Sequence, residues 1–73
     1  MIRFKIKELI ADKEFSSGKR VTVKEISELT GIGRGTLSKM INQKGANTTL
    51  ENIDRLCKFF NCEIQDVVTY IDK

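Results

Sequence analysis

The apolar residues of this chain recur mostly every three or four positions, the spacing that places them on one face of a helix. The pattern predicts five helices, over residues 6–15, 23–30, 34–43, 49–60 and 64–68. Near the N-terminus, Ile2, Phe4 and Ile6 instead alternate with charged residues, which is typical of a strand. Since the tail at residues 69–71 is β-branched and aromatic, we expect it to pair with residues 2–4 in a short ribbon that joins the termini.

Capping residues must set the ends of these helices, because the chain contains no proline. Thr22 and Glu25 have the spacing of a capping box, in which the hydroxyl of the first residue accepts a hydrogen bond from the amide of the second. Gly31 suits the left-handed conformation that ends a helix. The fourth helix repeats both features, at Thr48, Glu51 and Asn61. The residues expected to face the core are Ile26, Leu29, Ile32, Leu37, Met40, Ile41, Leu50, Ile53, Leu56, Cys57 and Phe60.

The stretch from Thr22 to Ile41 contains two short predicted helices joined by a tight, glycine-containing turn. Its apolar residues are spaced so that the second helix packs steeply across the first and keeps its opposite face free. A single helix fits the major groove of DNA, so a free helix face in this arrangement is suited to reading bases. The sequence therefore predicts a helix-turn-helix whose second helix begins near Arg34.

Charge is distributed along the chain in a way that suits a polyanionic partner. Lysine and arginine number 13 against 10 acidic residues, for a net charge of +3. Residues 15–24 and 33–50 each contain three basic residues and no acidic one, whereas residues 51–73 contain five acidic and three basic residues. This clustering of positive charge in the centre of the chain favours a nucleic acid as the partner.

Composition argues against several other classes of protein. The 73 residues are enough for one domain, which we expect to span residues 1–73. With no histidine and no glycine-rich loop after a strand, we expect no enzyme activity, cofactor or metal. No apolar run approaches the roughly 20 residues that span a bilayer, and the N-terminus lacks a secretory pattern, so we expect a cytoplasmic protein. Disulfides are rare there, and we interpret Cys57 and Cys62 as small apolar core residues.

Two segments resemble the phage-repressor and Cro-like (XRE-type) family of helix-turn-helix transcriptional regulators. Residues 30–42, TGIGRGTLSKMIN, are similar to the family's usual TGISRSTLSKIIN, and residues 50–62, LENIDRLCKFFNC, resemble its fourth helix. The resemblance covers residues 1–72. It implies an all-α, five-helix, lambda-repressor-like domain that binds double-stranded DNA as a transcriptional regulator, and repression is the role that we expect. It also suggests a homodimer on a palindromic operator.

The resemblance also assigns roles to individual residues. The base-reading positions correspond to Arg34, Gly35, Ser38 and Lys39, and an arginine binds guanine O6 and N7 as a fork. The backbone-contacting positions correspond to Thr22, Lys24, Thr36, Asn42, Gln43 and Lys44. Gly33 and Gly35 depart from the family, which commonly has serine there, and Ser27 replaces its usual alanine. The loop from Phe15 to Val21 is longer than typical, and its Lys19 and Arg20 are either phosphate contacts or solvated charges.

One alternative stays open, because a fold does not by itself fix a function. The same fold could serve as a protein-protein interaction module that has lost DNA binding. Three basic side chains, those of Arg34, Lys39 and Lys44, favour DNA binding over this alternative. A module without a DNA partner has no need of a helix face that lacks acidic residues.

Overall fold

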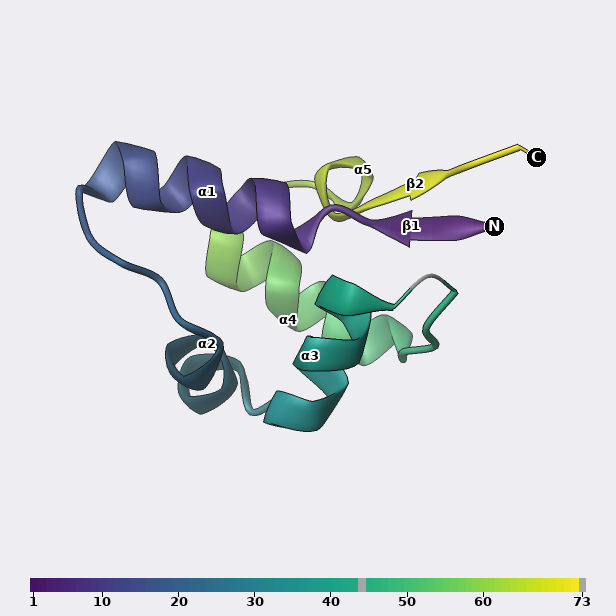
Figure 1. The fold of residues 1–73 in the computed structure, drawn as a ribbon, viewed down its shortest axis with the longest axis horizontal. Coiled ribbons are helices and arrows are strands. Elements are labelled where there is room, and N and C mark those ends of the chain that lie inside the picture. Colours follow the sequence, from purple (N-terminus) through teal and green to yellow (C-terminus); the bar gives the residue numbers. More distant parts are fainter. Residues whose placement is uncertain (44, 73) are drawn as a thin grey trace.

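The fold is a small helical bundle with its two ends joined by a ribbon (Figure 1). The computed structural model describes residues 1–43 and 45–72. Over these residues the elements are β1 (Ile2–Phe4), α1 (Ile6–Ser17), α2 (Val23–Thr30), α3 (Arg34–Asn42), α4 (Leu50–Phe60), α5 (Ile64–Val67) and β2 (Val68–Tyr70). The expected all-α architecture with a short ribbon is confirmed. The longest described helix, α1, has 12 residues, and none of the described helices is long and apolar enough to cross a membrane.

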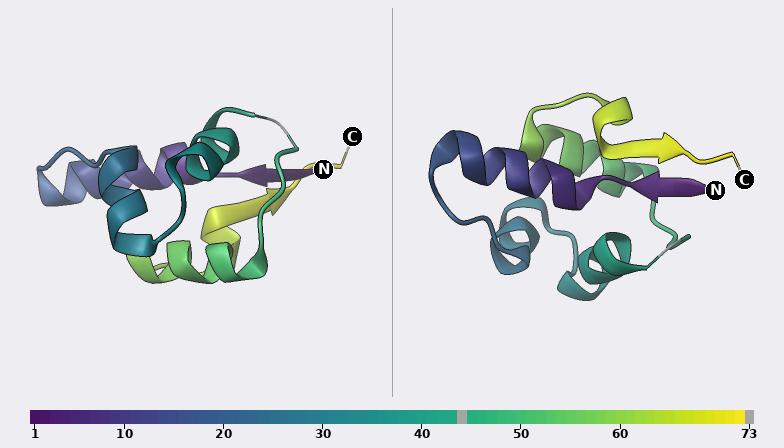
Figure 2. Two further views of the ribbon diagram at one scale, coloured as in Figure 1. Left: turned by 90° about the horizontal axis from the view of Figure 1, so that it is seen from below. Right: turned by 45° about the horizontal axis from the view of Figure 1, so that its top comes forward.

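Strands β1 and β2 form the predicted ribbon and run antiparallel, with Ile2 opposite Tyr70 and Phe4 opposite Val68. The ribbon continues beyond the strands, because the Met1 amino group donates to the Ile71 carbonyl at 3.0 Å and the Ile71 amide donates to the Met1 carbonyl at 2.7 Å. Figure 2 shows the two strands side by side in both views. Strand β2 begins one residue earlier than the predicted tail, so the fifth helix ends at Val67 rather than at residue 68.

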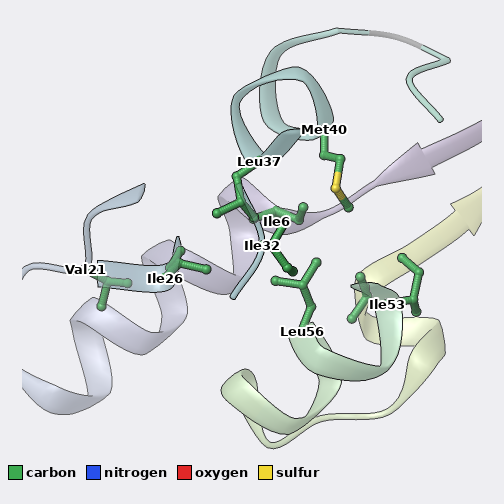
Figure 3. Packing of buried hydrophobic residues seen from close by; sticks show 9 residues of the cluster. Ile6, Val21, Ile26, Ile32, Leu37, Met40, Ile53 and Leu56 are labelled. Atoms are coloured by element: carbon green, nitrogen blue, oxygen red, sulfur yellow. The ribbon is translucent and has the colours of Figure 1, made fainter. Parts of the chain in front are cut away.

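Each of the five helices contributes at least one residue to a single apolar core (Figure 3). The residues that are completely enclosed are Ile6, Ile26, Leu37, Leu56 and Val67. Val21, Ile32, Met40 and Ile53 complete the buried set, while Cys57 and Cys62 are half-buried and pack against it as free thiols. Because side chains from α1, α2, α3 and α4 meet here, the core fixes the position of α3 relative to the rest of the bundle (Figure 3).

Two residues expected in the core lie at the surface instead. Leu29 is 67% exposed and Leu50 is 82% exposed. Leu29 lies in the last turn of α2, where it borders a hollow together with Phe59 of α4 rather than entering the core. Leu50 is the first residue of α4, one turn before Ile53, the first buried residue of that helix. Both predictions were wrong for the same reason: the helical spacing extends beyond the part of each helix that other elements cover.

Several predicted helix ends differ from those observed. Helix α1 continues to Ser17, because Gly18 adopts the left-handed conformation (φ 70°) and its amide donates to the Glu14 carbonyl at 2.9 Å. Helix α3 ends at Asn42, and Gln43 is its C-cap. Helix α4 begins at Leu50, one residue later than predicted. Its cap is Thr49, whose hydroxyl accepts from the Asn52 amide at 3.1 Å, so the expected capping box of Thr48 and Glu51 is wrong.

Candidate nucleic-acid interface

The predicted cap of α2 is present. The Thr22 hydroxyl oxygen accepts a hydrogen bond from the Glu25 amide at 3.1 Å and thereby satisfies one of the free amides at the start of the helix. The hydroxyl proton of Thr22 is not used by this bond, so it stays available for an external acceptor. Both Thr22 and Lys24 are exposed. The start of α2 thus presents a hydroxyl donor and an ammonium group to solvent.

The turn between α2 and α3 is held by hydrogen bonds at each of its residues. Gly31 adopts the left-handed conformation (φ 79°), and its amide donates to the Ser27 carbonyl at 2.9 Å. The Thr30 hydroxyl donates to the Ile26 carbonyl at 2.6 Å and accepts from the Ile32 amide at 3.2 Å. Ile32 itself is buried in the core, as predicted. The turn is therefore fixed by glycine geometry, a side-chain bridge and an apolar anchor, which together set the direction of α3.

Helix α3 separates its buried and exposed residues onto opposite faces. Leu37 and Met40 are buried, while Arg34, Gly35, Ser38 and Lys39 are all exposed, and these four are the positions expected to read bases. Gly33 is the N-cap and supplies no side-chain hydrogen bond, so the first-turn amides of α3 have no side-chain acceptor there. Thr36 is only half-buried, at the border between the two faces.

The exposed cations of this region take no part in the ion pairs that the described residues form. Those pairs join Arg3 to Glu8, Arg55 to Glu51 at 3.5 Å, and Lys58 to Asp54 at 3.4 Å. Within residues 1–43 and 45–72, Lys19, Arg20, Lys24, Arg34 and Lys39 have no acidic partner within 4.0 Å. Their positive charge is therefore not neutralised locally, and it is available to an anionic ligand.

The residues at the C-terminal end of α3 are also at the surface. Asn42 and Gln43 are exposed, and the Asn42 side-chain amide donates to the Ser38 hydroxyl at 3.5 Å. This contact links the last residue of α3 to its exposed face one turn earlier. The next predicted site residue, Lys44, lies outside the described residues.

The long loop before α2 is anchored by a contact that sequence reasoning missed. Val21 is buried, and its amide donates to the Glu14 carboxylate of α1 at 2.8 Å. The single apolar residue within a polar loop was the available signal. Lys19 and Arg20 are exposed on this loop, which Figure 1 places on the far side of α2 from α3.

Comparison with known proteins agrees with this geometry. The family model of the Cro/C1-type HTH DNA-binding domain matches residues 5–73, which include the helix-turn-helix and α4. No curated protein and no solved structure gives a significant match to the chain. The match covers nearly the whole sequence and bears out the resemblance to Cro-like regulators, and the four positions of α3 that were expected to read bases are exposed. The chain therefore belongs to the family of Cro/C1-type helix-turn-helix DNA-binding domains, and its role is DNA binding in transcriptional regulation.

Proposed function

We propose that this protein is a repressor that binds one specific double-stranded DNA sequence by inserting α3 into the major groove. The observation that carries the proposal is the exposed face of α3, which presents two cations and no acidic residue on a helix whose other face is buried. A helix fixed in this way offers donors at set positions, which sequence-specific reading requires. Repression follows from occupancy, since a bound protein excludes other proteins from the same site.

Base reading is assigned to Arg34, Gly35, Ser38 and Lys39. Arg34 is the first residue of α3, where a recognition helix approaches base edges most closely. Its guanidinium matches the two acceptors of guanine. A Cβ placed on Gly35 would have no heavy atom within 4 Å, so that position leaves room for close approach of the DNA. Ser38 and Lys39 follow one turn later on the same face.

Backbone contacts are assigned to residues on either side of α3. Thr22 and Lys24 lie at the start of α2, Thr36 borders the exposed face, and Asn42 and Gln43 follow it. Donors in such places set the register of a protein on DNA without reading sequence. Lys44 is assigned to the same group, and Lys19 and Arg20 to outer phosphate contacts, on their charge.

We also propose that residues 1–73 form a single domain and act as a homodimer on a palindromic operator, with half-sites about one helical turn apart. Of the apolar residues near the C-terminus, Tyr70 is 68% exposed and is the best candidate for the dimer contact. Val68 is half-buried. Phe59 already packs edge-on against Phe60, with ring centroids 4.9 Å apart, so it is less available.

Selection of bound sequences from a random duplex pool tests the proposal. The expected result is one enriched motif with two-fold symmetry, and Arg34→Ala should lose preference at one base pair of each half-site. Lys58→Ala is the matched control, because it removes a cation from α4, which carries none of the assigned contacts, and it should leave the motif unchanged. A pool without enrichment at low salt would contradict the proposal and favour the protein-interaction module instead. An asymmetric single half-site would contradict the dimer alone.

A further inference from the structure

The C-terminal end of α4 brings the two cysteines of the chain together. The helix ends in a Schellman motif, with Asn61 in the left-handed conformation (φ 52°). The Cys62 amide donates to the Cys57 carbonyl at 3.0 Å, and the Asn61 amide donates to the Lys58 carbonyl at 3.3 Å. In this motif the chain turns back on the helix, and the residues at its two ends are brought close enough that their side chains frequently touch. Here those two side chains are thiols.

The chemical state of the pair restricts what it can bind. Both thiols are free and half-buried. Burial raises the pKa of the Cys62 thiol, and the nearby Cys57 thiol and Asp66 carboxylate raise it further. Cys62 therefore stays protonated at neutral pH. A protonated thiol is a weak nucleophile and a weak ligand for divalent metal ions, which bind the thiolate.

We propose that Cys57 and Cys62 together form a binding site for one trivalent arsenic centre. This element bonds to neutral thiols by condensation. With an aryl arsenic oxide, two As–S bonds form, the As=O bond breaks, and the oxygen leaves as water with both thiol protons. With arsenous acid, two As–OH groups exchange for As–S bonds and two waters leave. Arsenic stays trivalent in both reactions, so no oxidant or reductant takes part.

The two thiols are enough ligands for trivalent arsenic but too few for a zinc ion. A structural zinc ion takes four ligands, and a catalytic one takes three from the protein. Within residues 1–43 and 45–72, no group of three cysteine, aspartate and glutamate side chains is placed to hold a metal ion. An aryl arsenic oxide needs only two sulfur atoms close together. The Schellman motif supplies both on one short segment, so little conformational entropy is lost when the second bond closes the ring.

The first test is a titration of the reduced protein with phenylarsine oxide, in the presence of a phosphine reductant. We expect one adduct per chain by intact mass and the loss of both free thiols. Cys57→Ala and Cys62→Ala each keep one thiol and act as controls for each other. Each should bind at least 100-fold more weakly, with the helical circular dichroism retained. Adducts that join two chains, or single variants that bind as tightly as the wild type, would overturn the proposal.

A second test asks whether the folded cap forms the site. Since a ligand that prefers the folded state stabilises it, phenylarsine oxide should raise the melting temperature of the wild type in a concentration-dependent way. Asn61→Gly keeps the left-handed conformation accessible and should bind like the wild type. Asn61→Ala disfavours that conformation and should bind several-fold more weakly. An unchanged melting temperature, or equal binding by the two Asn61 variants, would show that any two nearby thiols suffice.

Discussion

The Thr30 hydroxyl lies 2.6 Å from the carbonyl oxygen of Ile26, one turn earlier in α2, and the same hydroxyl accepts from the Ile32 amide. One side chain thus bridges the last turn of α2 and the start of the turn that leads to α3. Replacing Thr30 with valine keeps the shape and removes both bonds. We expect the free energy of unfolding to fall by about 1–2 kcal/mol. Urea denaturation measures this, and Thr30→Ser, which keeps the hydroxyl, should lose clearly less.

Gly31 offers a test of backbone conformation alone. A Cβ at this position would lie 3.7 Å from the Arg55 guanidinium, an ordinary contact, so steric overlap is not the cost. Alanine is strained in the left-handed conformation that Gly31 adopts (φ 79°), so Gly31→Ala should destabilise the protein by about 1–2 kcal/mol. The matched control is Gly35→Ala, within helix α3 and in open space, which should stabilise by about 0.5–1 kcal/mol. Equal effects at the two glycines would contradict this explanation.

Core packing predicts that replacing two different leucines by alanine will change the free energy of unfolding by very different amounts. Leu37 is fully enclosed, and Leu37→Ala should lower the free energy of unfolding by about 2–5 kcal/mol. Leu50 is 82% exposed, and Leu50→Ala should change it by less than about 0.5 kcal/mol. Thermal or urea unfolding of both variants checks the prediction. A comparable loss at Leu50 would mean that its side chain is covered in solution, for example by a second copy of the chain.

Replacing Arg34 and Lys44 in turn should show which of the two contributes to sequence specificity and which only to affinity. Arg34→Ala should cost about 1–3 kcal/mol on the selected operator and relax preference at one base pair, which we expect to be G·C. Lys44→Ala should weaken binding to all sequences alike and reduce the salt slope by about one. Binding curves on operator and random duplexes measure both. If the two variants lower specific and non-specific binding by the same factor, Arg34 contacts phosphate rather than a base.

Salt dependence should report the number of phosphate contacts. With about 4–6 contacts per monomer, the logarithm of the binding constant should fall against the logarithm of salt concentration with a slope near −4 to −5. Titrations of a half-site duplex at several salt concentrations give this slope. Lys19→Ala combined with Arg20→Ala should reduce it if the loop touches the backbone. An unchanged slope in that variant would show that these two charges are simply solvated.

Much of the fold was readable from the sequence because local signals and the core agree. Thr22, Gly31 and Asn61 all act as caps where their residue types suggested. Ile26, Leu37 and Leu56 show the helical spacing and lie in the core. Spacing alone could not place Leu29 and Leu50, because it does not tell how far a neighbouring element extends along a helix. The cap of α4 was misassigned because two adjacent threonines are both suitable caps, and it is the Thr49 hydroxyl that accepts from the Asn52 amide.

The candidate site was predictable in outline for a similar reason. The turn around Gly31 and the buried Leu37 together determine which residues of α3 are exposed, and both have clear sequence signals. The link between Glu14 and Val21 had a weaker signal, the single apolar residue of a polar loop, because it joins a helix to a loop seven residues later through a side chain. The contact between Cys57 and Cys62 likewise follows from the geometry of a helix end rather than from any residue preference.

The terminal ribbon has a consequence for the order in which the chain folds. The bond from the Met1 amino group to Ile71 joins residues 70 positions apart, whereas the turn around Thr30 joins residues within four positions. Closing the longer loop costs more chain entropy, and only the three strand pairs and the Met1–Ile71 pair of the ribbon compensate for it. The helix-turn-helix therefore assembles early, and the ribbon joins last and opens first. Amide hydrogen exchange should accordingly be fast at Ile71 and slow at Leu37.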